Sequence, residues 1–192
     1  MMKFLTASAA ALLVAGCGAL SGQAPPPNDG DFTLWSPAFA DGAALERRHA
    51  GNLRTNPNCV GENVSPPLAW RNPPPGTKSL AIVVHDQAGF NGLGVAHWVA
   101  YGIDPKVTGF AENEAGKSPV KWVAGKNSLN QDLYLGPCPA PRTGLHAYVF
   151  TLIATDLEPG ALPAGLTMPQ LLERFKGHAK GASAIVLRYR PN

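Results

Sequence analysis

The sequence predicts a mainly β fold, a single domain of antiparallel sheets packed against each other, with a helix near the C-terminus and long loops. Three observations support this prediction. Of the 192 residues, 21 are Gly and 19 are Pro, so turns must be frequent. Apolar residues make up 45% of the chain and charged residues only 15%, which is enough to build a sizeable core. Short apolar runs of the length of strands separate the turns.

Five of these runs are predicted to be strands. They are residues 31–35, 79–85, 97–103, 147–155 and 183–189. Residues 80–84 are almost continuously apolar, which is typical of a central strand covered on both faces. In the last run Ile185, Leu187 and Tyr189 are two residues apart, so their side chains should share one buried face.

One helix is predicted between Thr167 and Gly177. Thr167 can cap its N-terminus, a proline in the first turn is tolerated, and Gly177 can end it. Leu171, Leu172 and Phe175 are expected to form its apolar face.

Residues 1–17 look like a lipoprotein signal peptide. After a basic start, residues 4–14 are apolar but too few for a transmembrane helix. Leu13-Val14-Ala15-Gly16-Cys17 resembles a lipoprotein cleavage box, after which Cys17 would be acylated. An ordinary secretory signal is the alternative. Gly18 follows Cys17, and by the common sorting pattern this favours a lipid-anchored protein of the outer membrane that faces the periplasm.

Residues 18–31 are rich in Gly, Pro, Asn and Asp and are predicted to be a flexible tether. The folded domain should then occupy residues 32–192, because no repeat or second region of different composition is present. The net charge of +3 is small and scattered, so nucleic acid is not an expected partner.

The cysteines predict a disulfide. If Cys17 carries lipid, Cys59 and Cys138 are left in an oxidising compartment, each in a loop rich in Gly or Pro. We therefore expect these two residues to be bonded to each other. Two buried free thiols are the alternative.

Four polar residues stand at the ends of predicted strands. Asp86 directly follows the central run and His97 opens the next one, so the two side chains can pair, and the Asp86 carboxylate is expected to accept a proton from one imidazole and fix its tautomer. His146 and Tyr148 are two residues apart on an extended run and should share a face. Trp98 is expected to point away from His97 and into the core.

These residues also occur within longer motifs. The motifs are Phe32-Thr33-Leu34-Trp35-Ser36-Pro37, Asn63-Val64-Ser65-Pro66-Pro67-Leu68-Ala69-Trp70, Asp86…His97-Trp98 and Gly136-Pro137-Cys138-Pro139…His146-Ala147-Tyr148. In this order they resemble the bacterial branch of the phosphatidylethanolamine-binding protein family, the Raf kinase inhibitor-like proteins. The resemblance implies a large central sheet flanked by a smaller one. It also implies a small cavity for anions such as phosphate groups, lined by Asp86, His97, His146 and Tyr148.

In this interpretation Gly136 lets the backbone approach the ligand. The chain departs from the family motifs at two positions. Ala88 stands where the family usually has a second acid, and Ala147 stands where it tends to have Arg.

We therefore expect an exported binding protein for a small anion, either phosphate or a phospholipid head group. It is expected to be no enzyme and to need no cofactor or metal, and its affinity should rise as the imidazoles become charged near pH 6.5. One alternative is a regulator or inhibitor of an exported protease or other protein, through residues 87–94 and 139–144. A weaker alternative is a hydrolase that uses a metal or acid–base chemistry, but the common hydrolase motifs are missing. The sequence leaves open whether the protein is a monomer or a homodimer.

Overall fold

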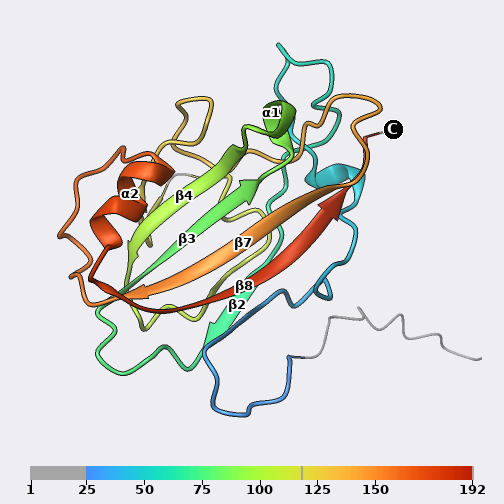
Figure 1. Cartoon of the computed structure of the whole chain (residues 1–192). Helices are drawn as coiled ribbons and strands as arrows, with labels where there is room; N and C mark the ends of the chain where they lie inside the picture. The colour runs from blue at the N-terminus through green and yellow to red at the C-terminus, as the bar shows by residue number, and fades with distance from the viewer. Residues whose placement is uncertain (1–24, 118, 192) are drawn as a thin grey trace, which may run out of the picture.

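The computed structural model describes residues 25–117 and 119–191, and within them two antiparallel sheets pack face to face (Figure 1). The 3-stranded sheet has the order β1 (Thr33–Trp35), β2 (Leu68–Arg71), β5 (Gly109–Phe110). The 5-stranded sheet has the order β6 (Val123–Ala124), β4 (Val95–Ile103), β3 (Ser79–Asp86), β7 (His146–Thr155), β8 (Ala179–Tyr189). The helical elements are the 3-10 turn η1 (Arg47–His49), α1 (Gly89–Gly92) and α2 (Met168–Phe175). The predicted mainly β fold, with a large sheet beside a smaller one, is confirmed.

The core has two layers, one on each face of the large sheet. Between the sheets, Leu68 and Trp70 of β2 pack against residues such as Ile82 and Val84 of β3. On the other face, α2 covers residues of β3 and β4; this cluster includes Val83, Val99, Tyr101, Leu171 and Phe175. Because β3 is covered on both sides, its apolar run is almost fully buried, as predicted.

All five predicted strands are present, with small shifts at their ends. The sequence prediction missed β2, β5 and β6. The last two have only two residues each, too few to show any periodicity. Trp70 lies in β2 and is buried in the core between the sheets, and its indole N–H donates to the carbonyl of Val107 (2.8 Å) in the loop between β4 and β5.

Helix α2 begins after Thr167, whose backbone N–H donates to the Gln170 side chain (3.0 Å). Leu171 and Phe175 are buried, as expected. Leu172 is 40% exposed, so its assignment to the apolar face was wrong. Each residue turns the helix by about 100°, and Leu172 is rotated out of the stripe formed by residues four apart.

The segment predicted to be a tether is described only from residue 25 onward, and this part contacts the domain (Figure 1). The Arg71 guanidinium donates to the carbonyls of Pro26 and Pro27. Asn72 Nδ2 donates to the side chain of Asn28 (2.8 Å). The signal peptide and Cys17 lie outside the described residues, so lipidation stays a prediction. Among the residues that are described, no helix is long and apolar enough to cross a membrane.

Candidate ligand-binding site

A cavity of about 520 Å³ lies at one end of the large sheet, where β3 ends and β4 and β7 begin. Its wall combines a polar floor from these strands with loops from distant parts of the sequence. The lining residues are Leu53, Asn56, Asn58, Asp86, Ala88, Gly89, Phe90, Asn91, Gly94, Val95, His97, Ser128, Leu129, Leu135, Cys138, Pro139, Ala140, Thr143, His146 and Tyr148. The structure thus brings together four of the five predicted ligand-binding residues.

Asp86 pairs with His146. The β3–β7 register sets Asp86 opposite Tyr148, and the carboxylate Oδ2 lies 2.7 Å from His146 Nδ1. Both side chains are only 4% exposed. The other carboxylate oxygen accepts the backbone N–H of Ala88 (3.0 Å). Asp86 therefore contacts a cavity imidazole, as expected, but strand β7 brings His146 to it in place of His97.

His146 and Tyr148 share one face of β7, as predicted from their spacing. Their rings are stacked, with centroids 6.5 Å apart. Burial raises the pKa of Tyr148, so its hydroxyl stays protonated and can donate a hydrogen bond. On the other side of His146, the Thr143 hydroxyl lies 2.9 Å from Nε2 and donates to the Ala140 carbonyl (2.6 Å).

His97 is held by a backbone carbonyl. Its Nδ1–H donates to the carbonyl oxygen of Leu135 (2.8 Å), and its ring packs edge-to-face on Tyr148 with centroids 4.9 Å apart. Burial lowers the pKa of His97 to about 4. The imidazole is therefore neutral near neutral pH, and the expectation that it charges near pH 6.5 does not hold for this residue.

A β-bulge in β4 brings His97 to the cavity. Ala96 pairs with His85 and Trp98 pairs with Val84, so His97 is an extra residue between two consecutive pairs. At such a bulge the alternation of side chains is interrupted. His97 contacts Tyr148, and Trp98 enters the core between the sheets on the same face. Trp98 is in the core as expected, but the prediction that it points away from His97 was wrong.

Gly136 is the one predicted ligand-binding residue that does not line the cavity. A Cβ atom at this position would lie 2.3 Å from the carbonyl oxygen of His49 and 2.8 Å from the nitrogen of Gly51. The glycine therefore permits two chain segments to approach each other, and this role replaces the predicted contact with a ligand. Its N–H donates to the Asn63 side chain (2.7 Å).

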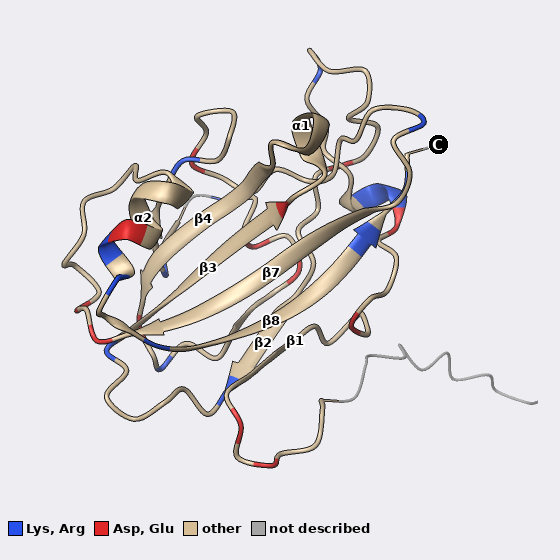
Figure 2. Ribbon diagram, viewed as in Figure 1, with Lys and Arg blue, Asp and Glu red and all other residues tan. Residues whose placement is uncertain are grey.

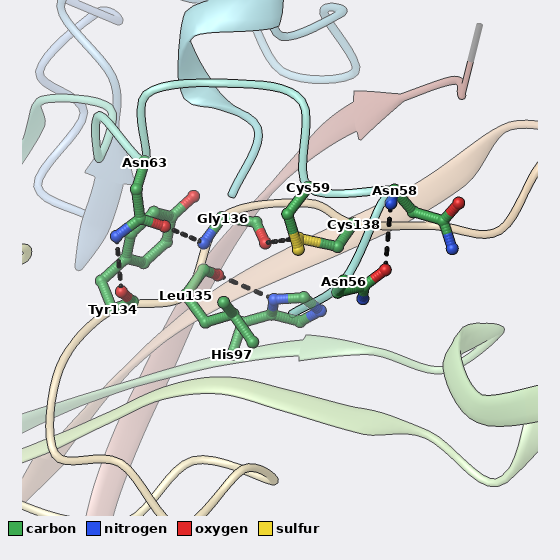
Figure 3. The surroundings of a disulfide bond; sticks show 9 residues. All are labelled: Asn56, Asn58, Cys59, Asn63, His97, Tyr134, Leu135, Gly136 and Cys138. Carbon is green, nitrogen blue, oxygen red and sulfur yellow. Dashed lines mark hydrogen bonds between the residues drawn. A yellow bond between two sulfur atoms is a disulfide. The ribbon is translucent and has the colours of Figure 1, made fainter. Parts of the chain in front are cut away.

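The predicted disulfide between Cys59 and Cys138 is present, with the two Cα atoms 4.6 Å apart (Figure 3). Cys138 lines the cavity. The bond therefore ties the loop that carries Leu53, Asn56 and Asn58 to the wall that faces the strand ends.

Comparison with known proteins identifies the family. The model of the family described as "Phosphatidylethanolamine-binding protein" matches residues 35–190. The chain belongs to this family. A UPF0098 protein of Methanothermobacter thermautotrophicus is 38% identical over 146 residues, which cover 73% of this chain and 91% of the relative.

Three further proteins are similar to this member of the phosphatidylethanolamine-binding protein family. A Mycobacterium tuberculosis protein whose name, LppC, gives it as a candidate lipoprotein is 39% identical over 71% of this chain and 64% of its own length. The solved structure of Escherichia coli YbcL has a TM-score of 0.74 and 26% identity, covering 84% of this chain and 99% of YbcL. The homologue CT736 from Chlamydia trachomatis has a TM-score of 0.71 and 27% identity, covering 85% of this chain and 99% of its own.

The rim of this family member's cavity is apolar and strained. Phe90 and Leu93 in and beside α1 are 73% and 77% exposed. Phe90 and Asn91 have φ angles of 50° and 58°, a left-handed backbone that side chains other than Gly disfavour. Non-glycine residues in this region often mark ligand sites. The sequence analysis included Phe90 only within residues 87–94, the contact surface of the alternative regulator, and not among the residues of the cavity.

Charge is sparse around the cavity. Asp86 is the one carboxylate among its lining residues, none of which is Lys or Arg. Strand β3 ends at Asp86, and Figure 2 shows this end of the strand in red beside the uncharged α1. Ala88, where the family usually has an acid, lines the cavity, whereas Ala147 is exposed and alternates away from His146. Within residues 25–117 and 119–191 no group of three His, Cys, Asp or Glu side chains is placed to hold a metal ion.

Proposed function

We propose that this member of the family is an exported binding protein that holds a small polar head group, of the phosphate or phospholipid type, in the cavity beside Asp86. The observation that carries this proposal is the convergence of Asp86, His97, His146 and Tyr148 in one cavity. Its volume of about 520 Å³ is in the range of sites for small molecules. The name of the family, which refers to a phospholipid, supports the same class of ligand.

The chemistry of the wall suits a small head group with an apolar remainder. Hydroxyl groups of Tyr148 and Ser128 and the amide of Asn58 can donate to phosphate oxygens. Phe90 and Leu129 can contact an apolar part at the mouth. Because the lining residues include no Lys or Arg, neutral donors and the Asp86–His146 pair must supply the binding free energy.

Calorimetry with phosphoethanolamine tests this function. Losing one hydrogen bond to a charged ligand costs about 1.5–3 kcal/mol, so His97→Ala and Tyr148→Phe should each weaken binding by roughly tenfold or more. His178→Ala is the matched control, because His178 is an exposed histidine bonded to Asp156 outside the cavity. Equal affinity of the wild type and both cavity variants would overturn the proposal.

A second candidate is a regulator of another exported protein. The exposure of Phe90 and Leu93 favours it, because large apolar side chains on a protruding loop are common in interfaces. Capture of a partner that is lost in Phe90→Asn with Leu93→Asn, but retained in His97→Ala, would support this candidate. Capture that depends on His97 would favour the cavity instead.

We also propose that the protein is anchored in the cell envelope through Cys17. The signal motif supports this location, and so does the name of the LppC relative. The outer membrane and a periplasmic orientation follow from Gly18 and belong to the same proposal.

A further inference from the structure

The hydrogen bond between His97 and Leu135 determines which ring nitrogen carries the proton. A carbonyl oxygen can only accept, so His97 Nδ1 must be the protonated nitrogen (2.8 Å). In a neutral imidazole the other nitrogen, Nε2, then has a free lone pair. This assignment follows from the geometry of the bond alone.

The free nitrogen of His97 opens onto the cavity. The ring of His97 lines the cavity. Some polar side-chain atoms of the described residues are fully buried and have no hydrogen-bond partner, but His97 Nε2 is not one of them. His49 provides the contrast, because its Nδ1 donates to Val64 (2.7 Å) and its Nε2 is sealed without a partner. In Figure 3 the second ring nitrogen of His97 lies on the side of the ring away from Leu135. A bound ligand can therefore reach it.

Asn63 fixes the segment that holds His97. Its Nδ2 donates to the Tyr134 carbonyl (3.0 Å), and its Oδ1 accepts the N–H of Gly136 (2.7 Å), so it brackets Leu135 (Figure 3). Leu135 in turn contacts His97 twice, because its N–H donates to the His97 backbone carbonyl (2.9 Å) and its carbonyl accepts from the ring. The side chain of Asn63 thus holds the Leu135 carbonyl oxygen, the atom that determines the tautomer of His97, in position.

Burial keeps the ring of His97 neutral. Desolvation is the dominant influence on its pKa, which it lowers to about 4. The hydrogen bond to Leu135 and the Asp86 carboxylate on β3 act in the opposite direction, while His85 on β3 and His146 on β7 lower the pKa further. Tyr148 on β7 contacts the ring as an uncharged phenol.

We propose that His97 acts as a hydrogen-bond acceptor that selects head groups bringing an O–H or N–H to its Nε2, and that Asn63 is the positioning residue for this tautomer. The inference rests on the proposed binding function and narrows its ligand class. A protonated phosphate, a hydroxyl group or an ammonium group satisfies the requirement. An oxyanion without a proton places its lone pairs against the lone pair of Nε2 and is disfavoured.

Two phosphate esters separate donor selection from charge. At pH 5 methyl phosphate and dimethyl phosphate are both chiefly monoanions, but only methyl phosphate has a P–OH group. We expect methyl phosphate to bind at least tenfold more tightly at pH 5. This advantage should vanish at pH 8, because the second phosphate pKa is about 6 and the donor is lost above it. Dimethyl phosphate, whose charge does not change, reports any titration of the protein.

His97→Phe should remove the preference between the two esters. Equal affinity of wild-type protein for both esters at pH 5 overturns the donor selection and leaves the binding function standing. Binding of neither ester, nor of phosphoethanolamine, overturns the function and this inference with it.

The role of Asn63 is tested by the tautomer itself. Nitrogen NMR of the wild type at pH 7 should show His97 protonated at Nδ1 and not at Nε2; the reverse pattern overturns the inference. Asn63→Gly keeps a residue suited to the φ of 61° but removes the bracket, so we expect mixed tautomers and a smaller preference for methyl phosphate. Asn113→Gly is the matched control, because Asn113 has the same φ of 61° and is exposed. An unchanged His97 tautomer in folded Asn63→Gly also contradicts the assigned role.

Discussion

At the scale of single residues, the two histidines of the cavity have different hydrogen-bond partners and therefore different chemistry. His146 is bonded to a carboxylate, whereas His97 is bonded to a carbonyl. The Asp86 charge is compensated locally by the His146 contact and by a backbone N–H. His97 can then remain neutral in a buried position beside it.

The neutral state of His97 predicts how stability depends on pH. Its pKa is about 4 in the folded protein and near 6.5 in the unfolded chain. Between these values the unfolded state binds the extra proton, so the unfolding free energy should decrease as the pH falls from 6.5 to about 4. For one proton the slope reaches about 1.4 kcal/mol per pH unit. Unfolding free energies of wild type and His97→Gln, measured by denaturant unfolding and plotted against pH, should diverge over this range. Parallel plots would contradict the assignment.

The Asp86–His146 pair should be costly to break. Both side chains are 4% exposed, so His146→Ala leaves a buried carboxylate without its partner. Loss of one member of a buried pair costs roughly 3–5 kcal/mol of unfolding free energy. The double variant Asp86→Asn with His146→Ala should cost clearly less than the sum of the two single variants, as measured by urea denaturation. Additive losses would show that the two residues do not interact.

The sequence predicted which polar residues meet but not how they pair. Local periodicity was enough to predict that His146 and Tyr148 share a face. It was also enough to predict that Asp86 stands at the end of a buried strand. The partner of Asp86 depends on the neighbour order β4-β3-β7, and the partner of His97 depends on a loop 38 residues away. Long-range placement of this kind leaves no local pattern, and for the same reason Asn63 was not singled out.

At the scale of elements, the cavity wall is a loop assembly that the disulfide holds against the strand ends. Cys59 and Cys138 are 79 residues apart, and closing such a loop stabilises a protein by about 4.5 kcal/mol in the chain-entropy model. We expect Cys59→Ser with Cys138→Ser to lower the denaturant midpoint and to weaken head-group binding. A reducing agent should reproduce both effects in the wild type and change neither in the double variant. Unchanged binding after reduction would show that backbone contacts alone hold the wall.

At the scale of the whole molecule, the site lies at one end of the large sheet, while the segment that begins at residue 25 contacts Arg71 at the end of β2 in the small sheet (Figure 1). The four long strands of the large sheet followed from the sequence because each contains an extended apolar or alternating run. Of the small sheet only β1 was predicted, because β2 and β5 are short and become strands only through their pairing.

The anchoring proposal is a prediction about the whole molecule. Cys17→Ala should release the protein from membranes into the soluble fraction, as followed by cell fractionation and immunoblotting. Each buried methylene of an acyl chain contributes about 0.8 kcal/mol to membrane binding, so the change should be nearly complete. Cys59→Ser with Cys138→Ser is the control and should stay with the membrane. Membrane association that survives Cys17→Ala would exclude this anchor.

Because of the bulge in β4, the residue that lines the cavity, His97, is not one of the residues that pair with β3. Ala96 and Trp98 already face consecutive residues of β3, so removing His97 would leave regular pairing at this point, although the second irregularity of this ladder, near Leu80, would remain. A deletion, usually the most damaging change inside a sheet, would here restore local pairing and remove the acceptor in one step. The contact with the cavity therefore depends on the one residue of this stretch that does not pair with β3, and the residues that pair there are a separate set.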